Sequence, residues 1–170
     1  SLRISLYGTD DDSTYFVTRH KKAYNLVKNN MIEFLKKRNE VNPDLKFGLN
    51  YIIIPDNIDT IIPLMEYIIE VNSKVDNGRG VDFLTIREDF GSVTDGDDID
   101  VKDRKYHLDG FLSIEQRKNL IDIFKEFNNR RDKECPDLHV DFGYAMIALG
   151  DGILGKPLAR VSGKQMRVSG

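Results

Sequence analysis

Apolar runs alternate with stretches of helical periodicity along the first half of the chain, and each apolar run ends in polar residues. The runs predict strands over about 2–7, 47–54 and 81–87. The stretches between them predict helices over about 14–37 and 58–72, because apolar residues recur there three and four positions apart. Strands that are apolar along most of their length are typical of a parallel sheet with both faces buried. The pattern therefore predicts a β-α-β-α-β order in an α/β fold.

The second half of the chain follows the same alternation less regularly. An acidic stretch over 88–109 has little periodicity. A capping box, with Ser113 at the N-cap and Gln116 at N3, predicts a helix that ends near Arg131. Residues 138–149 then have the pattern of a further strand.

The predicted helix over 58–72 has two notable residues at its start. Asp56 or Asn57 would cap it, because short polar side chains accept hydrogen bonds from N–H groups of the first turn. Pro63 falls inside the helical pattern, where it either occupies an early turn or forces a local kink.

Parallel strands joined by crossover helices make either a segment of a barrel or an open doubly wound sheet. A half barrel would leave long strand edges and an apolar face open, which favours aggregation. If the chain is stable alone, we therefore expect a partner segment or self-association. A monodisperse monomer that binds no dye specific for exposed apolar patches would contradict this expectation.

Composition narrows the functional classes. A formal net charge of −3 argues against a general nucleic-acid binder, which would carry a basic face. No apolar run has the length needed to span a membrane. Cys135 is the single cysteine, so the chain has no internal disulfide framework, and the cytoplasm is the predicted compartment.

Candidate chemistry lies at the carboxyl ends of the predicted strands, where α/β folds place their sites. The first strand, which contains Ser5, leads into Gly8 and then Arg19. The structural interpretation is a small core residue, a turn glycine and a solvated arginine. The third strand ends in Arg87-Glu88-Asp89, which is either a substrate-recognition cluster or a salt-bridged rim.

The order and spacing of these segments resemble the radical S-adenosylmethionine superfamily. Arg3-Ile4-Ser5-Leu6-Tyr7-Gly8 is similar to the fourth barrel strand of that family, and Arg19 and the helix over 23–35 follow it as they do there. Residues 47–57 resemble its fifth strand, with a Pro-x-Asn exit, and 81–87 resemble its sixth. The resemblance covers most of residues 1–130.

Two departures from the family pattern matter. The Cys-x-x-x-Cys-x-x-Cys motif is absent, and the resemblance implies that it lies before Ser1, where it would bind the [4Fe-4S] cluster. Tyr7 stands where an aspartate is common. The resemblance thus implies that 1–150 is the C-terminal portion of a partial (β/α)6 TIM-like barrel and that 151–170 is a tail. It also implies that this segment alone is inactive.

The resemblance gives roles to individual residues. Ser5 would hydrogen-bond the ribose of S-adenosyl-L-methionine, and Arg19 would pair with the carboxylate of that cofactor. Asn50 and Ile54 would line the adenine side of the fifth strand. The backbone near Thr85 would meet the adenine edge.

The residues that the resemblance implies for substrate binding lie at the end of the third predicted strand. Arg87 would bind a phosphate or carboxylate, and Glu88 or Asp89 would bind hydroxyls or act as a general base. This ending, with the Tyr-Gly turn of the first strand, is similar to the branch that acts on nucleotide-linked amino sugars. The resemblance thus implies radical-initiated elimination, deamination or oxidation of a polar substrate, such as a dTDP-linked amino deoxysugar.

Two other functions remain open from the sequence. A radical peptide maturase with auxiliary clusters would have several further cysteines after residue 170. A non-catalytic α/β binding module would lack the three-cysteine motif before Ser1.

Other polar groups support simpler interpretations. The stretch over 95–100 lacks the glycine and closing glutamate of an EF-hand, so it is interpreted as a solvated acidic loop. Three histidines have no metal-ligand spacing, and the basic residues of the tail suit an exposed terminus. These residues are His20, His107, His139, Arg160, Lys164 and Arg167.

Overall fold

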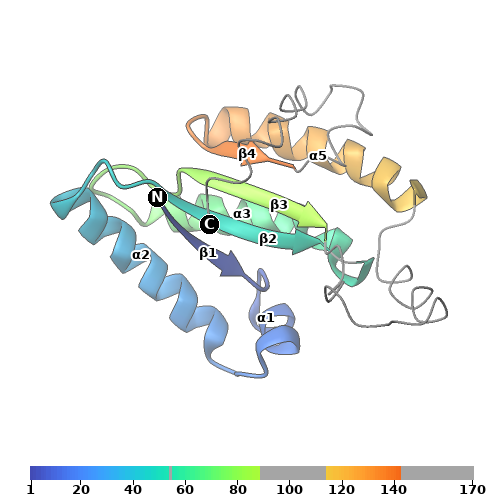
Figure 1. Ribbon diagram of the computed structural model, residues 1–170, viewed down its shortest axis with the longest axis horizontal. Helices are drawn as coiled ribbons and strands as arrows, with labels where there is room; N and C mark the ends of the chain where they lie inside the picture. Colours follow the sequence, from blue (N-terminus) through green and yellow to red (C-terminus); the bar gives the residue numbers. More distant parts are fainter. Residues whose placement is uncertain (54, 89–113, 143–170) are drawn as a thin grey trace, which may run out of the picture.

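Four parallel strands form one sheet in the order β1-β2-β3-β4 (Figure 1). The computed structural model describes residues 1–53, 55–88 and 114–142. The strands are β1 (Leu2–Leu6), β2 (Phe47–Ile53), β3 (Phe83–Glu88) and β4 (His139–Asp141). The helices are α1 (Asp11–Thr18), α2 (Ala23–Val41), the 3-10 helix η1 (Pro55–Thr60), α3 (Ile61–Ser73) and α5 (Ile114–Glu134).

The predicted α/β class and parallel sheet are confirmed. The first three strands begin and end within two residues of the predicted bounds. The last predicted strand is observed over His139–Asp141, and the rest of its predicted range from 143 onward lies outside the described residues. A partial TIM-like barrel remains a prediction, because the described strands form an open sheet.

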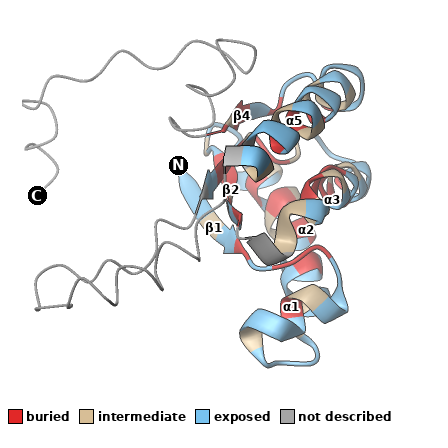
Figure 2. Cartoon of the chain, turned by 90° about the vertical axis from the view of Figure 1, so that its right-hand side faces the viewer, coloured by how far each residue is buried: buried red, intermediate tan, exposed pale blue. Residues whose placement is uncertain are grey.

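Helices α2, α3 and α5 cover one face of the sheet (Figure 2). On that face Leu49, Tyr51, Leu84 and Ile86 are at most 2% exposed. Burial of each such side chain stabilises the fold by about 1.5–3 kcal/mol. The helices contribute Leu35, Leu64, Ile68, Phe124 and Phe127 to the same core. Within the parts that the structure describes, none of the helices is long and apolar enough to cross a membrane.

The prediction of one helix over 14–37 is wrong, because two helices occupy this range. Arg19 ends α1 in the left-handed region, with φ 56° and ψ 20°, and its N–H donates to the Tyr15 carbonyl. A non-glycine residue in that conformation cannot continue a right-handed helix. The chain then turns through His20 and begins α2 at Ala23.

The start of α3 also differs from the prediction. Neither Asp56 nor Asn57 caps it, because both lie in η1, and Thr60 occupies the N-cap position. The Asn57 side chain instead donates to the Ile52 carbonyl at 2.9 Å. Pro63 lies in the first turn of α3, where its missing N–H removes no helical hydrogen bond.

A buried ion pair joins α2 to the amino end of the sheet. Arg38 Nη1 donates to Asp82 Oδ2 at 2.7 Å, and the two side chains are 0% and 7% exposed. The same Asp82 oxygen accepts the Phe47 N–H at 2.8 Å. Arg38 also donates to the carbonyls of Leu45 and Gly80. This network fixes where β2 and β3 begin relative to α2.

Candidate functional site

Four polar residues form a row across the sheet, one from each strand. The strand register pairs Ser5 with Asn50, Asn50 with Thr85, and Thr85 with Asp141. These residues alternate with the buried ones that face α2, α3 and α5, so they lie on the opposite face. We call that face the helix-free face of the described residues, and these four residues the polar row. With strands about 4.8 Å apart, the row is roughly 14 Å long.

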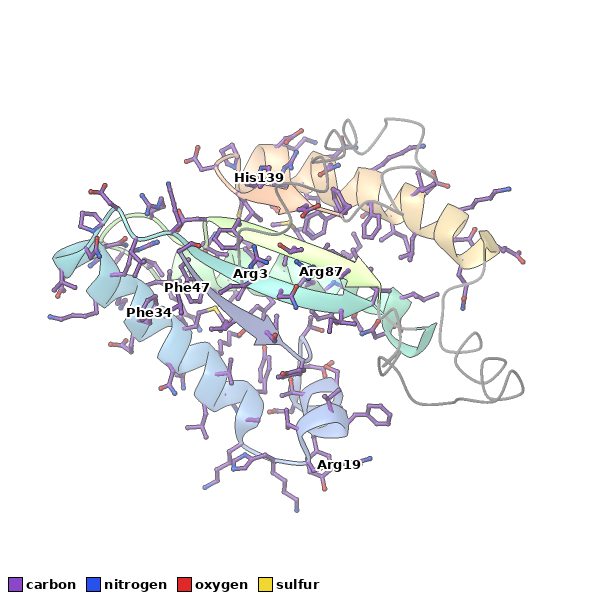
Figure 3. All side chains as sticks on the ribbon, in the orientation of Figure 1. Arg3, Arg19, Phe34, Phe47, Arg87 and His139 are labelled. Carbon is purple, nitrogen blue, oxygen red and sulfur yellow. The ribbon has the colours of Figure 1, made fainter. Side chains whose placement is uncertain are left out.

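An aromatic layer lies on the amino side of the polar row. Gly48 and Phe83 are register partners, and a Cβ atom at Gly48 would lie 2.0 Å from the Phe83 ring. The ring therefore lies directly over Gly48. Arg3 stacks on the same ring, 5.1 Å from its centroid, and Figure 3 places Arg3 over the sheet. His139 is the exposed register partner of Phe83 on β4.

A third layer lies on the carboxyl side of the polar row. Ile52 and Arg87 are register partners there, and both are exposed. Figure 3 shows Arg87 on β3 toward the carboxyl end of the strands. Side chains of alternate residues in layers are typical of the interior of a barrel of parallel strands.

A hollow of about 200 Å³ lies at the carboxyl ends of β1 and β2. Its polar residues include Ser5 and Asn50, and Tyr7, Val17 and Ile52 contribute apolar wall. The Asn50 Oδ1 atom is buried and has no hydrogen-bond partner. Burying an acceptor without a donor costs free energy, so a ligand that donates a hydrogen bond there would be favoured.

The residues of this hollow fit part of the cofactor that the resemblance implies. Apolar walls suit the faces of a flat heteroaromatic ring, and the Asn50 carbonyl oxygen can accept from an exocyclic amine. The Ser5 hydroxyl can donate or accept at the edge of the same hollow. An adenosine group therefore has suitable partners at this end of the polar row.

A larger hollow, of about 700 Å³, lies along the amino side of the polar row, from Arg3 on β1 to Asp141 on β4. Thr85 and Asp141 line it, together with Arg3, Phe83 and His139. Thr85 is 3% exposed, whereas Asp141 is partly exposed. The predicted contact of Thr85 with the adenine edge stays a prediction, because Thr85 is the register partner both of Asn50 in the smaller hollow and of Asp141 in the larger one.

The turn that follows β1 positions the smaller hollow. Asp10 caps α1: its carboxylate accepts hydrogen bonds from the Ser13 hydroxyl at 2.6 Å and from the Ser13 N–H at 2.7 Å, and these bonds lower the pKa of Asp10. The Ser13 hydroxyl in turn accepts the N–H groups of Thr9 and Asp10. Gly8 is buried against this capped end. The turn thereby sets α1, which carries Val17, against the end of β1.

Gly8→Ala should destabilise this turn. The added Cβ would lie 2.4 Å from the Thr14 backbone nitrogen and 2.7 Å from the Ser13 carbonyl carbon, and neither backbone atom can move freely. We expect a loss of about 1–3 kcal/mol in the free energy of unfolding, measured by urea denaturation. Glu33→Ala, at an exposed position of α2, is the control and should change it by less than about 0.5 kcal/mol. Equal stability of the two variants would show that the turn tolerates a side chain.

Arg19 is not brought to the strand ends. It is exposed at the end of α1 and stacks on Phe16, with its guanidinium carbon 5.5 Å from the ring centroid. Figure 3 shows it at the far end of α1, well away from Arg3 and Arg87. Its pairing with a cofactor carboxylate stays a prediction that the described geometry does not support.

The remaining predicted residues are placed in part. Glu88 ends β3 and is the register partner of Ile53 on β2. Asp89 and Ile54 lie outside the described residues. The proposed cluster of Arg87, Glu88 and Asp89 therefore stays a prediction.

The described residues do not supply a metal centre. No group of three or more histidine, cysteine, aspartate or glutamate side chains within 1–53, 55–88 and 114–142 could hold a metal ion. Cys135 is buried, and desolvation raises the pKa of its thiol. Its Sγ accepts from Asn72 at 3.7 Å. Cluster ligands before Ser1 remain a prediction.

Asp141 is the functional candidate that sequence reasoning missed. The signal was an aspartate between the apolar residues Val140 and Phe142 in a predicted strand. Because successive side chains of a strand point to opposite faces, this pattern puts a charge on one face of the sheet. The sequence could not show which strand lies beside this aspartate, and so could not show that it lies next to Thr85.

Comparison with known proteins gives one informative similarity. No protein family model matches the chain. Over 152 residues the chain is 31% identical to a protein of Streptomyces venezuelae named dTDP-4-amino-4,6-dideoxy-D-glucose ammonia-lyase. The match covers 89% of this chain and 28% of that protein, so the chain spans less than a third of its relative's length. The name of the relative agrees with the ammonia-lyase branch that the sequence resembles.

Proposed function

We propose that the chain provides the cofactor- and substrate-binding strands of a radical S-adenosylmethionine enzyme that eliminates ammonia from a nucleotide-linked amino sugar. The observation that carries the proposal is the polar row, which places one polar residue from every strand on the helix-free face. The similarity to an ammonia-lyase of a dTDP-linked amino sugar supports the reaction class. The chain matches only 28% of that relative, so the activity is proposed for the whole protein.

The cofactor end of the proposed site is the smaller hollow. S-adenosyl-L-methionine, when bound, would supply the radical that begins the elimination. Asn50 would accept a hydrogen bond from the adenine through its unpartnered Oδ1, and Ser5 would bond the ribose. The apolar wall that includes Ile52 would exclude water from the base.

The substrate end of the proposed site is the part of the polar row on β3 and β4, together with the layer on its carboxyl side. Thr85 lines the larger hollow next to Asn50 of the smaller one, and its hydroxyl can hydrogen-bond a sugar hydroxyl. Arg87, one layer toward the carboxyl end, would bind the diphosphate through its planar guanidinium. Glu88 and Asp89 are proposed, as the resemblance implies, to bind hydroxyls or to accept a proton. The chain's role is to orient the sugar beside the cofactor and to hold its charged groups.

The activity can be tested with the full-length protein under anaerobic conditions. The protein, with its iron–sulfur cluster reconstituted, is incubated with S-adenosyl-L-methionine, a reductant and dTDP-4-amino-4,6-dideoxy-D-glucose. We expect release of ammonia that requires S-adenosyl-L-methionine. The absence of both ammonia release and cofactor consumption would contradict the proposal. So would a parent sequence without Cys-x-x-x-Cys-x-x-Cys before Ser1.

Asn50→Leu should weaken cofactor binding without disturbing the fold. Leucine has nearly the same shape as asparagine but cannot accept the adenine hydrogen bond. A lost hydrogen bond of about 1–1.5 kcal/mol corresponds to a roughly tenfold weaker affinity. The measurement is calorimetric titration of full-length protein with S-adenosyl-L-methionine.

Asn25→Leu, at an exposed position of α2, is the matched control for that titration and should leave the affinity unchanged. If Asn50→Leu binds the cofactor as tightly as the unchanged protein, Asn50 has no role in recognising adenine.

A further inference from the structure

Asp141 is held at a defined place in the polar row. It ends β4 and is the register partner of Thr85 on the buried strand β3. The start of β4 is fixed by two backbone bonds: His139 N–H donates to the Asp82 carbonyl at 3.0 Å, and Leu138 N–H donates to the Cys135 carbonyl at 3.0 Å. The sheet therefore fixes the backbone of Asp141, and a binding residue requires such a rigid support.

Charges of both signs line the larger hollow, with Arg3, Lys46 and Arg79 beside Asp82, Asp137 and Asp141. Asp82 is bonded to Arg38 and lies in ion-pair contact with Arg79. Asp137 is exposed in the turn before β4. Among strand residues whose side chains the structure describes, Asp141 is the acidic residue on the helix-free face. It thus places negative charge where Thr85 places a hydroxyl.

We propose, on the basis of the proposed function, that Asp141 binds the protonated 4-amino group of the sugar and selects amino sugars over their 4-hydroxy counterparts. An ammonium group donates charge-assisted hydrogen bonds to a carboxylate, and such bonds contribute more than neutral ones. A hydroxyl in the same place offers one neutral donor. A site that pairs a charged side chain with one substrate group disfavours the analogue that lacks this group.

The position of Arg87 agrees with this orientation of the sugar. Arg87 lies two residues beyond Thr85 on β3, and Asp141 lies one strand to the side. With a rise of about 3.3 Å per residue and strands about 4.8 Å apart, their backbones are roughly 8 Å from each other. A hexose ring bridges a comparable distance from a C4 substituent to a phosphate on the C1 oxygen. One nucleotide sugar can therefore reach both residues at once.

The experiment compares two ligands on the same full-length protein, reconstituted with its cluster. Calorimetric titration at pH 7 measures the affinity for dTDP-4-amino-4,6-dideoxy-D-glucose and for the analogue with a hydroxyl at C4. We expect the unchanged protein to bind the amino sugar at least tenfold more tightly. In Asp141→Asn this preference should fall to about twofold or less, while the affinity for the hydroxy analogue stays unchanged.

The control is Asp137→Asn, which removes a nearby exposed carboxylate and should keep the full preference. Asp141→Ser is measured in parallel, so that a fold defect particular to the asparagine variant does not decide the result. If either folded Asp141 variant keeps the tenfold preference, the assignment of Asp141 is wrong although the proposed function stands. If the unchanged protein binds neither nucleotide sugar, the proposed function itself is wrong.

Discussion

Arg38→Met should lower the free energy of unfolding by about 3–5 kcal/mol, because the buried Asp82 carboxylate loses its buried partner and keeps the ion-pair contact with the partly exposed Arg79. The side chains of Arg38 and Asp82 are 0% and 7% exposed, so water cannot replace the lost guanidinium without opening the structure. Methionine also removes the donors to the carbonyls of Leu45 and Gly80. The loss therefore includes buried acceptors as well as the ion pair.

A second change should not restore the lost stability. Replacing a whole buried ion pair with apolar residues is often neutral, because no charge remains buried. Here Asp82 Oδ2 also accepts the Phe47 N–H at 2.8 Å. The double variant Arg38→Met with Asp82→Leu would leave that backbone donor unsatisfied at the start of β2. We therefore expect the double variant to remain less stable than the unchanged protein.

Urea denaturation and thermal melting measure the Arg38 effect. For a chain of 170 residues, a loss of about 3–5 kcal/mol lowers the melting temperature by roughly 6–20 °C. Lys37→Met is the matched control, since Lys37 is the exposed neighbour with only a surface pair to Glu40, and it should change stability by less than about 1 kcal/mol. Similar melting temperatures for the two variants would mean that the ion pair contributes no more than a surface pair.

The strands could be predicted because their signal is local. β2 and β3 each carry a run of apolar residues between turn residues, and a buried parallel strand needs little more. Their parallel direction followed from the helical stretch between one strand and the next, which returns the chain to the same edge of the sheet. The pairing of Ser5 with Asn50 and of Asn50 with Thr85 is different, because register depends on contacts between distant strands.

The errors have physical causes that periodicity cannot reveal. The break at Arg19 comes from a left-handed residue and a capped helix beginning at Asp10, while the apolar spacing continues across it. Lys28 and Arg38 of α2 are charged, which favours exposure, yet both are buried. Lys28 bonds Glu70 at 2.5 Å, and Arg38 bonds Asp82, so each burial depends on a partner more than 40 positions away. A single sequence gives no sign of such partners.

The candidate site could be predicted only where its residues lie on strands that the resemblance covers. The resemblance identified Ser5, Asn50 and Thr85, and the register brings all three into one row. Asp141 completes the row from the strand whose role the resemblance did not cover. Arg19 shows the opposite case, because its proposed role depended on a loop whose path only the structure describes.

Arg87→Ala should reduce the affinity for the nucleotide sugar by about 100-fold in the full-length protein. A guanidinium can make two charge-assisted hydrogen bonds to a diphosphate, and their loss together is worth roughly 3 kcal/mol. Arg87 is exposed on the helix-free face, next to Ile52, so its side chain is accessible to a ligand. Calorimetric titration with dTDP-4-amino-4,6-dideoxy-D-glucose measures the affinity, and the KM for ammonia release should rise in parallel.

Two further variants separate diphosphate recognition from general charge. Arg87→Lys keeps the positive charge but cannot form the paired bonds, so we expect an intermediate loss of about tenfold. Arg3→Ala removes a cation from the same face at the amino side, where Arg3 stacks on Phe83, and it should leave the affinity nearly unchanged. If Arg3→Ala and Arg87→Ala weaken binding equally, the face attracts the ligand through its overall charge, and Arg87 has no specific contact with the diphosphate.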